Sequence, residues 1–532
     1  MNPLASTKCA GRLLMALAAI VSILLIAGCG SSSSTPTPNP VGFTLASLTG
    51  TYVFSSEGFD AGGNPLAVAG AVVASGTGSI TGGTIDIIDP GFTPIPTTAA
   101  QPITSGSYSV NSDGRGTATL TSSYGTYTFD FVLTSTSHGL VSEFDGNGDG
   151  SGTLDLQTAV TSLTGLAGPY AFSIAGSDGS NLSPFAIVGA FSLDASGDVT
   201  GFEDFNDNAV FGSQALVTGG VATLGSGTGP GTIPVADFDG GPLSFDFYPI
   251  DATHWKLIET DYNDFLAGDA FTQTGASSIP TGPLAFTMSG GISSPIAAGG
   301  FITFSGTSVG GTADVNADGT VVTATTIAGT ASTPGSVGGR VVVSFTDFNP
   351  ATTLVVYPSS GGLLMLETDS NNLTVGAALA QQAGATIGAT QAYGLDLAAF
   401  NTSGGNDEDD IAQFTTSSSG FTGTVDINDN FFTGSSGNPV LTSVALSDTT
   451  ALTLDSTGRC QATTASGSSP FVSFICYAVS SNTFLLLETD SNQIGVGTFE
   501  SQSSTAAAAA AHPVAFMVRP ADRSRAIKPR KR

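Results

Sequence analysis

A short acidic segment with the pattern Glu-x-Asp recurs four times in this chain, each time shortly after an apolar run. The copies are Glu143-Phe144-Asp145, Glu259-Thr260-Asp261, Glu367-Thr368-Asp369 and Glu488-Thr489-Asp490. Their glutamates are 116, 108 and 121 residues apart. A long sequence period of this kind indicates similar folded units in tandem. We therefore expect four domains, over residues 45–158, 162–275, 279–382 and 387–502.

The residue pattern inside each unit predicts an all-β fold. The chain contains 70 glycines, its Thr- and Val-rich runs are short, and no long helical periodicity is present. Units open with a Gly-x-aromatic-x-Phe strand, as in Gly50 to Phe54 and Gly168 to Phe172, where aromatic side chains alternate as on a half-buried strand. About eight short strands fit into each unit. We expect an eight-stranded, antiparallel up-and-down β-barrel, with a β-sandwich as the alternative.

Two resemblances accompany this pattern. The opening strand and the unit length resemble lipocalin and avidin barrels, which implies a closed barrel for each unit. The set of repeats behind a lipid-attachment sequence resembles uncharacterised multi-repeat surface lipoproteins of environmental bacteria, a resemblance that implies an exported, anchored protein but no particular activity.

The N-terminus carries the features of a bacterial lipoprotein signal. Lys8 and Arg12 precede an apolar run from Leu13 to Ile26, which is too short for a spanning helix of about 20 residues. The sequence Ile-Ala-Gly-Cys ending at Cys29 is similar to a lipobox. We expect residues 1–28 to be removed, Cys29 to be acylated and residues 29–44 to form a Ser/Thr/Pro linker. Because Gly30 follows, the resemblance implies an outer-membrane or cell-surface location.

Acidic residues dominate the middle of the chain, and basic residues dominate its end. Between Gly30 and Thr505 there are four basic residues and 41 acidic ones, a formal balance of −37. Such a surface repels nucleic acid and suits solubility, divalent cations or basic partners. The end of the chain, 503–532, is Ala-rich and basic, and we expect it to be disordered.

The scarce arginines recur at matching positions. Three of them follow a glycine, and an aspartate also recurs once in each unit, at Asp86, Asp204, Asp314 and Asp426. We expect each arginine to pair with an acid of its own unit, because a guanidinium suits bidentate pairing with a carboxylate. The expected pairs are Arg115 with Asp86 or Glu143, Arg340 with Asp314 or Glu367, and Arg459 with Asp426 or Glu488. The second unit has no such arginine, and its Lys256 is expected to point to the opposite face from Glu259.

Two cysteines remain once Cys9 and Cys29 are set aside. Cys460 and Cys476 lie symmetrically about a Ser/Gly/Pro turn between two strand-like runs. In a hairpin centred on that turn they face each other, so we expect a disulfide.

Two chemical sites fit parts of the sequence. Asp145, Asn147 and Asp149 match the first half of an EF-hand loop, but Leu156 stands where that loop has its glutamate. Calcium is one interpretation, and ordinary Asx-turns are the other. The Glu-x-Asp pairs also resemble part of a laminarinase-like acid strand, but the third acid is missing in all four copies. We expect no enzymatic activity and no obligatory cofactor.

Three functions are compatible with these features. The first is a membrane-anchored tandem array, a stalk, adhesin or ligand-binding surface that meets an envelope polymer, a glycan or a protein. The second is a carrier of small apolar ligands, although inward-facing aromatic residues argue against a large cavity. The third is a polysaccharide-active enzyme. A pocket above about 300 Å³ inside a unit would favour the carrier.

Overall fold

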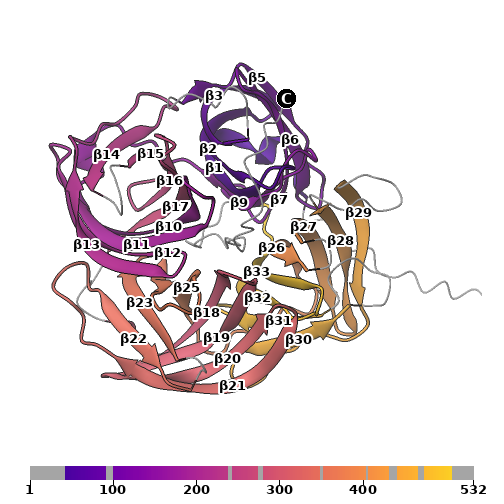
Figure 1. Ribbon diagram of the computed structural model, residues 1–532. Helices are drawn as coiled ribbons and strands as arrows, with labels where there is room; N and C mark the ends of the chain where they lie inside the picture. The colour runs from indigo at the N-terminus through magenta and orange to yellow at the C-terminus, as the bar shows by residue number, and fades with distance from the viewer. Residues whose placement is uncertain are drawn as a thin grey trace, which may run out of the picture. The chain divides into compact units, whose positions relative to one another are not determined.

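The computed structural model describes residues 42–91, 100–237, 243–273, 279–347, 351–402, 405–429, 440–464 and 473–505, which belong to one compact unit. The predicted signal peptide, the acylation site at Cys29 and the basic residues of the tail lie outside these ranges. Nearly all regular structure is β, and Figure 1 shows it as four groups of strands in chain order. Within the described part, no helix has the length and apolar character needed to cross a membrane.

The first two repeats each begin with a short 3-10 turn, η1 (Leu45–Ser47) and η2 (Leu163–Gly165). Repeat 1 contains β1 (Thr49–Phe59), β2 (Pro65–Ser75), β3 (Ser79–Ile88), β4 (Gln101–Pro102), β5 (Ser105–Tyr108), β6 (Arg115–Ser122), β7 (Gly125–Leu133), β8 (His138–Glu143) and β9 (Ser151–Leu156). Repeat 2 contains β10 (Gly168–Asp178), β11 (Pro184–Leu193), β12 (Val199–Asp207), β13 (Val210–Thr218), β14 (Gly231–Asp237), β15 (Ser244–Pro249), β16 (His254–Glu259) and β17 (Asp264–Thr272).

Repeats 3 and 4 have eight strands each. Repeat 3 contains β18 (Pro283–Gly290), β19 (Ile296–Ser305), β20 (Ser308–Ala317), β21 (Thr320–Ala331), β22 (Val341–Phe345), β23 (Thr352–Ser359), β24 (Gly362–Glu367) and β25 (Thr374–Ala380). Repeat 4 contains β26 (Ala392–Asn401), β27 (Asn406–Ser417), β28 (Gly420–Asp429), β29 (Val440–Asp448), β30 (Arg459–Thr463), β31 (Ser473–Ala478), β32 (Thr483–Glu488) and β33 (Gln493–Ser501).

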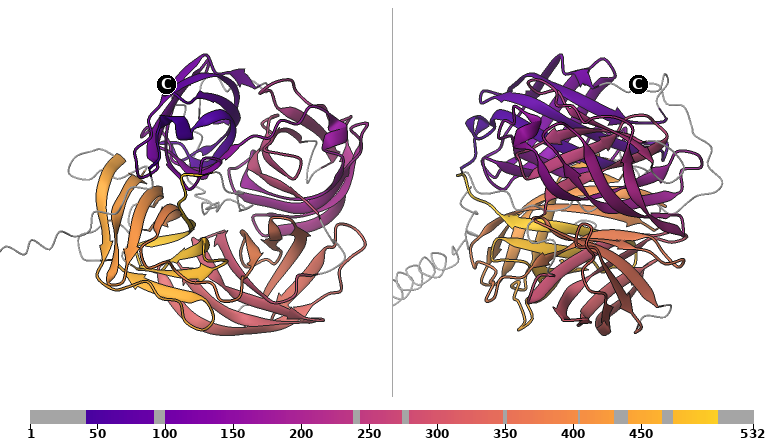
Figure 2. Two further views of the ribbon diagram at one scale, coloured as in Figure 1. Left: turned by 180° about the vertical axis from the view of Figure 1, so that it is seen from behind. Right: turned by 90° about the vertical axis from the view of Figure 1, so that its left-hand side faces the viewer.

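Most consecutive strands of a repeat pair antiparallel, and the first strand of each repeat also pairs with the last. In repeats 2 and 3 this closes an eight-stranded barrel, whose curved walls can be followed from behind in Figure 2. The sheet of repeat 1 gains the extra short strand β4, and its β2 also pairs with β3. The sheet of repeat 4 ends at β29 and β30, which are not paired with each other. The predicted all-β fold of four antiparallel units is therefore confirmed: repeats 2 to 4 have the expected eight strands, repeat 1 has one more, and two of the units are closed barrels.

In the two closed barrels the first strands are mostly buried on both faces, which explains why most of their residues are apolar. In β10, Tyr170 and Phe172 point inward and join a core that includes Trp255. The intervening Ala171 points outward and packs with Val355 of repeat 3. One face thus forms a barrel interior and the other a contact with the next repeat.

Four apolar clusters join the repeats in a closed series. Val53 of repeat 1 packs in a cluster with Ile258 of repeat 2. Equivalent clusters join repeat 2 to repeat 3 and repeat 3 to repeat 4. A smaller cluster of Val132, Leu140 and Ile411 joins repeat 4 back to repeat 1. Each repeat therefore contacts two others, including the first and the last.

Candidate functional site

The interior of the third barrel contains a cavity of about 340 Å³. All eight strands contribute residues to its walls, together with the loop between β24 and β25. The lining residues are Phe286, Met288, Ile296, Ala298, Ile302, Ala313, Val315, Ala317, Ile327, Phe345, Thr352, Leu354, Met365, Glu367, Asn371, Asn372 and Thr374. The cavity exceeds the size that the sequence analysis set as favouring a carrier, so the expectation that inward aromatic residues leave little room is wrong for this repeat.

Polarity changes along the cavity. The deep wall is apolar and buried, with Ile302, Phe345 and Met365 each 4% exposed or less. Asn371 is exposed and Asn372 is half-buried, so the loop that carries them forms the mouth. A molecule inside would place an apolar body deep in the barrel and any polar group toward this loop.

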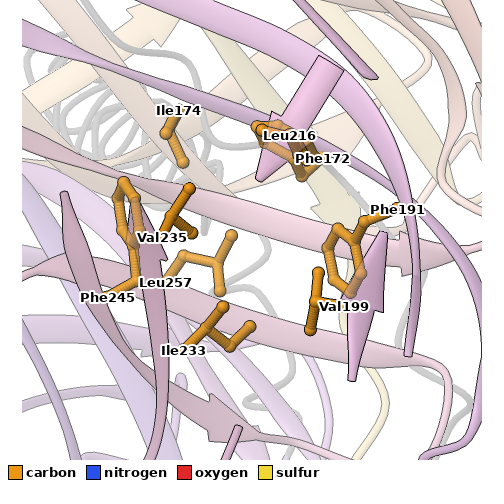
Figure 3. A pocket seen from close by; sticks show the side chains of 9 residues that line it. All are labelled: Phe172, Ile174, Phe191, Val199, Leu216, Ile233, Val235, Phe245 and Leu257. Carbon is orange, nitrogen blue, oxygen red and sulfur yellow. The ribbon is translucent and has the colours of Figure 1, made fainter. Parts of the chain in front are cut away.

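The barrel of repeat 2 is filled by larger side chains. A space of about 30 Å³ lies among apolar side chains in its interior, whose packing Figure 3 shows. Pairing registers make Gly189 and Glu203 equivalent to Gly300 and Ala313. Counting outward from these pairs along the strands, Phe185, Ile187 and Phe205 of repeat 2 correspond to Ile296, Ala298 and Val315 of repeat 3. Smaller side chains at these positions open the third barrel.

Glu367 is the ionisable group in the cavity lining. It ends β24, where the strand reaches the mouth, and its side chain is almost wholly buried. Thr374 donates a hydrogen bond from Oγ1 to Glu367 Oε2 at 2.9 Å. Burial, with a further contribution from Asp369, raises the pKa of Glu367 to about 8. The carboxyl group is therefore mostly neutral at pH 7 when nothing else is bound.

The aspartate of the Glu-x-Asp segment has a different task from the glutamate. In all four copies it accepts a hydrogen bond from the backbone N–H two residues later, which is an Asx-turn. In repeat 3, Asp369 Oδ1 accepts from Asn371 N at 2.9 Å, and Asp369 Oδ2 accepts from Thr353 N at 2.9 Å. The recurring segment thus places one acid in the barrel and uses the other to shape the mouth loop.

The neighbouring repeat holds this mouth loop in place. Asn206 of β12 donates from Nδ2 to the carbonyl oxygens of Glu367 at 2.9 Å and Asn372 at 3.0 Å. Asn316 and Asn428, the equivalent residues of repeats 3 and 4, bind carbonyls around Glu488 and Glu143 in the same way. The sequence analysis missed this role, although the asparagine two residues after Asp204, Asp314 and Asp426 was a visible signal.

No protein-family model matches this chain, and no curated protein matches it.

The recurring arginines bind acids of the preceding repeat. Arg340 donates from Nε and Nη2 to the two carboxylate oxygens of Asp204, at 2.6 and 2.5 Å. Arg459 binds Asp314 in the same bidentate way, at 2.9 and 3.0 Å. The predicted pairing inside one repeat, with Asp314 or Glu367 for Arg340 and with Asp426 or Glu488 for Arg459, is therefore wrong. The arginines instead join consecutive repeats.

A tyrosine completes each of these two contacts. Tyr357 donates its hydroxyl to Asp204 Oδ2 at 2.6 Å, and Tyr477 donates to Asp314 Oδ2 at 2.7 Å. Pairing places Tyr477 directly opposite Arg459 on the neighbouring strand. Sequence reasoning missed these tyrosines, and their recurrence at similar stages of repeats 3 and 4 was the available signal.

The other two contacts each keep half of this arrangement. Between repeats 1 and 2 only the tyrosine is present, because repeat 2 lacks the arginine: Tyr248 of repeat 2 donates a hydrogen bond to Asp86 of repeat 1 at 2.6 Å. Asp426 of repeat 4 is bound by Arg115 of repeat 1 at 3.0 Å, and Val132 stands opposite Arg115 where repeat 4 has its tyrosine. The predicted pairing of Arg115 with Asp86 or Glu143 is therefore wrong. Within its own repeat Arg115 instead contacts Asp113, with Nε 3.2 Å from Oδ2.

Three other charged residues that the sequence analysis singled out, Glu143, Glu488 and Lys256, are buried, and the recurring arginines bind other acids. Glu143 and Glu488 have no exposed surface, and burial followed by the charge of Asp490 raises the pKa of Glu488 well above its ordinary value. Lys256 lies fully buried, with Nζ 2.8 Å from Asp269 Oδ1. That aspartate also lies 2.6 Å from Nε2 of His254.

The two cysteines form a disulfide. Cys460 and Cys476 are directly opposite each other in the β30–β31 ladder, with Cα atoms 4.9 Å apart. Both side chains point into the core of repeat 4. The turn that separates the two strands lies outside the described residues.

The calcium interpretation of residues 145–149 is not supported by their geometry. Asp145 makes the Asx-turn described above, whereas Asp149 is buried and its Oδ1 accepts a hydrogen bond from Phe59 N at 2.7 Å. Asn147 is exposed. Across the part of the chain that the structure describes, no group of three or more His, Cys, Asp or Glu side chains is placed to hold a metal ion.

Proposed function

We propose that this protein is an exported, lipid-anchored carrier of a small and mainly apolar molecule, which binds inside the third barrel. The observation that supports this proposal is the cavity of about 340 Å³ with apolar walls and a few polar groups near its mouth. Cavities of about 300 to 1,000 Å³ with this composition are typical of small-molecule sites. The other three repeats act as the scaffold that holds the third.

The contacts between repeats favour this proposal over a stalk. A stalk that projects from the membrane keeps its first and last units apart, whereas Arg115 of repeat 1 binds Asp426 of repeat 4. The clamp from Asn206 to the mouth loop also gives the neighbouring repeat a role in shaping the site.

Binding can be measured with N-phenyl-1-naphthylamine, an apolar probe whose fluorescence rises when it leaves water. The mature chain with Cys29 replaced by alanine should bind about one probe per molecule. The double substitution Ala298→Ile and Val315→Phe introduces the side chains of repeat 2 and should abolish this binding. Thr326→Phe adds bulk at an exposed residue beside the inward-facing Ile327, on the outer face of the same barrel, so it serves as the control. Equal binding by all three proteins would contradict the proposal.

The anchor is tested separately. Mass spectrometry of the mature N-terminus should find Cys29 as the first residue with acyl chains attached, and Cys29→Ser should release the protein from membranes. A mature chain that begins elsewhere would remove the anchor and leave the cavity proposal standing.

A further inference from the structure

The position of Glu367 bears on which molecules the third barrel can hold. Its carboxyl group lies between the apolar depth and the mouth, at 5% exposure. Thr374 beside it is 6% exposed and gives it one hydrogen bond. A ligand that fills the apolar depth would therefore bring a polar head group to this carboxyl.

The charge of the surroundings selects among head groups. Among the described residues, the lining contains no Lys, Arg or His, and its remaining polar side chains are two amides and two hydroxyls. An anionic head group would stand beside a carboxyl group in a site of low polarity, without a cation to compensate. The chain between the linker and the tail also carries 41 acidic and four basic residues, which attracts cations and repels anions over longer distances.

We propose that the ligand of the third barrel is an apolar amine, and that the carboxylate of Glu367 is the counter-ion of its ammonium group. This inference rests on the proposed carrier function and adds the chemical class of the ligand. The ammonium group would lie near the mouth, and the hydrocarbon part would lie against Phe286, Ile302 and Phe345.

Binding of an ammonium ion displaces a proton. In the free protein Glu367 is mostly protonated at neutral pH, because burial, followed by Asp369, raises its pKa to about 8. Asp369 is the other carboxylate that acts on it, and the lining adds no further charge. The ammonium ion keeps its own protons, the glutamic acid releases one proton to water, and an ion pair forms. The affinity for an amine should therefore rise up to tenfold per pH unit between about pH 6 and 8. A neutral ligand that accepts a hydrogen bond from protonated Glu367 would show the opposite slope.

Three compounds with one apolar cage separate these cases: 1-adamantanamine, 1-adamantanol and adamantane-1-carboxylate. Each is titrated against the probe bound to the mature chain, at pH 6, 7, 8 and 9. We expect the amine to bind at least tenfold more tightly than the alcohol at pH 8, and the carboxylate to bind most weakly. Glu367→Gln should remove the preference for the amine and its pH dependence but keep the binding of the alcohol. Glu259→Gln, the matched change in the filled barrel, should change neither.

Two results would overturn the inference and leave the carrier function intact. In the first, all three compounds displace the bound probe equally well, or none of them displaces it. In the second, the alcohol binds more tightly than the amine, and its affinity falls above pH 8. Absence of probe binding in the unmodified mature chain would instead contradict the carrier function itself. The pH slope of the unmodified protein decides the question even if Glu367→Gln fails to fold.

Discussion

Arg340 and Asp204 belong to different repeats, yet they share two hydrogen bonds in one planar, bidentate contact. Asp204 is 1% exposed, so loss of the guanidinium would leave a buried carboxylate with only hydroxyl donors. Arg340→Met should lower the free energy of unfolding by about 3 to 5 kcal/mol, measured by urea denaturation. The double variant Arg340→Met/Asp204→Asn should recover part of this loss. Equal stability of the single variant and the unmodified protein would show that the contact contributes nothing.

A substitution at Gly299 tests the role of Tyr477, the tyrosine that binds Asp314 between repeats 3 and 4. A Cβ atom at Gly299 would lie 2.4 Å from the ring of Tyr477, which reaches across to Asp314. Gly299→Ala should therefore displace Tyr477 and lower the melting temperature, whereas Gly310→Ala should be mild because its nearest atom lies 3.6 Å away. Comparable melting temperatures for both variants would contradict this account of the interface.

Asn206 should affect binding in the third barrel although it belongs to the second. Asn206→Asp replaces the donor that holds two carbonyl oxygens of the mouth region, and it places an acceptor against them. We expect binding of the fluorescent probe to weaken about tenfold, which corresponds to about 1.4 kcal/mol. Asn428→Asp breaks the equivalent clamp on repeat 1 and should leave probe binding unchanged. If both variants bind as the unmodified protein does, the clamp does not shape the site.

Asp86 should make the protein more stable on the acidic side of neutrality. Burial, together with the nearby Asp246, raises the pKa of Asp86 to about 8 from an ordinary value of 3.8. Between these values the folded protein holds a proton that the unfolded chain releases, so stability falls as pH rises through this window, by up to about 1.4 kcal/mol per pH unit.

Urea denaturation at pH 5, 6, 7 and 8 measures this slope. Asp86→Asn keeps a neutral side chain at every pH and should make the slope smaller, whereas Asp198→Asn changes an exposed residue and should not. A stability that rises from pH 5 to pH 8, with no difference between the two variants, would contradict the assignment.

The disulfide should stabilise the open edge of repeat 4. Cys460 lies on β30, which pairs with β31 but not with β29. The bond closes a loop with a sequence separation of 16, for which the chain-entropy model gives about 3 kcal/mol. The double substitution Cys460→Ala/Cys476→Ala should lower the free energy of unfolding by about 2 to 5 kcal/mol. Dithiothreitol should destabilise the unmodified protein by a similar amount and leave the double variant unaffected.

The sequence predicted the all-β repeat fold because strand alternation and a regular period are local and repetitive signals. It could not predict which repeat each arginine would contact. In a periodic chain the acid of the same unit and that of the neighbouring unit occupy equivalent positions, so spacing alone cannot distinguish Asp314 from Asp204 as the partner of Arg340. Three-dimensional packing between the repeats decides that choice.

The cavity was missed for a related reason. The Glu-x-Asp motif drew attention to Glu367, but the motif is shared by all four repeats. The difference lies in side-chain volume at positions that the motif does not include, such as Ala298 in place of Ile187. A comparison of residue size at equivalent inward positions would have pointed to repeat 3.

The contact between Arg115 and Asp426 also restricts how a gene of this kind can change in length. In an open array, an added or deleted repeat creates one new junction and leaves the two ends free. Here the last repeat must meet the first, so a five-repeat or three-repeat descendant would have to alter every junction angle at once. A change in copy number would therefore disturb the contacts between repeats, whereas a substitution inside one barrel leaves those contacts in place.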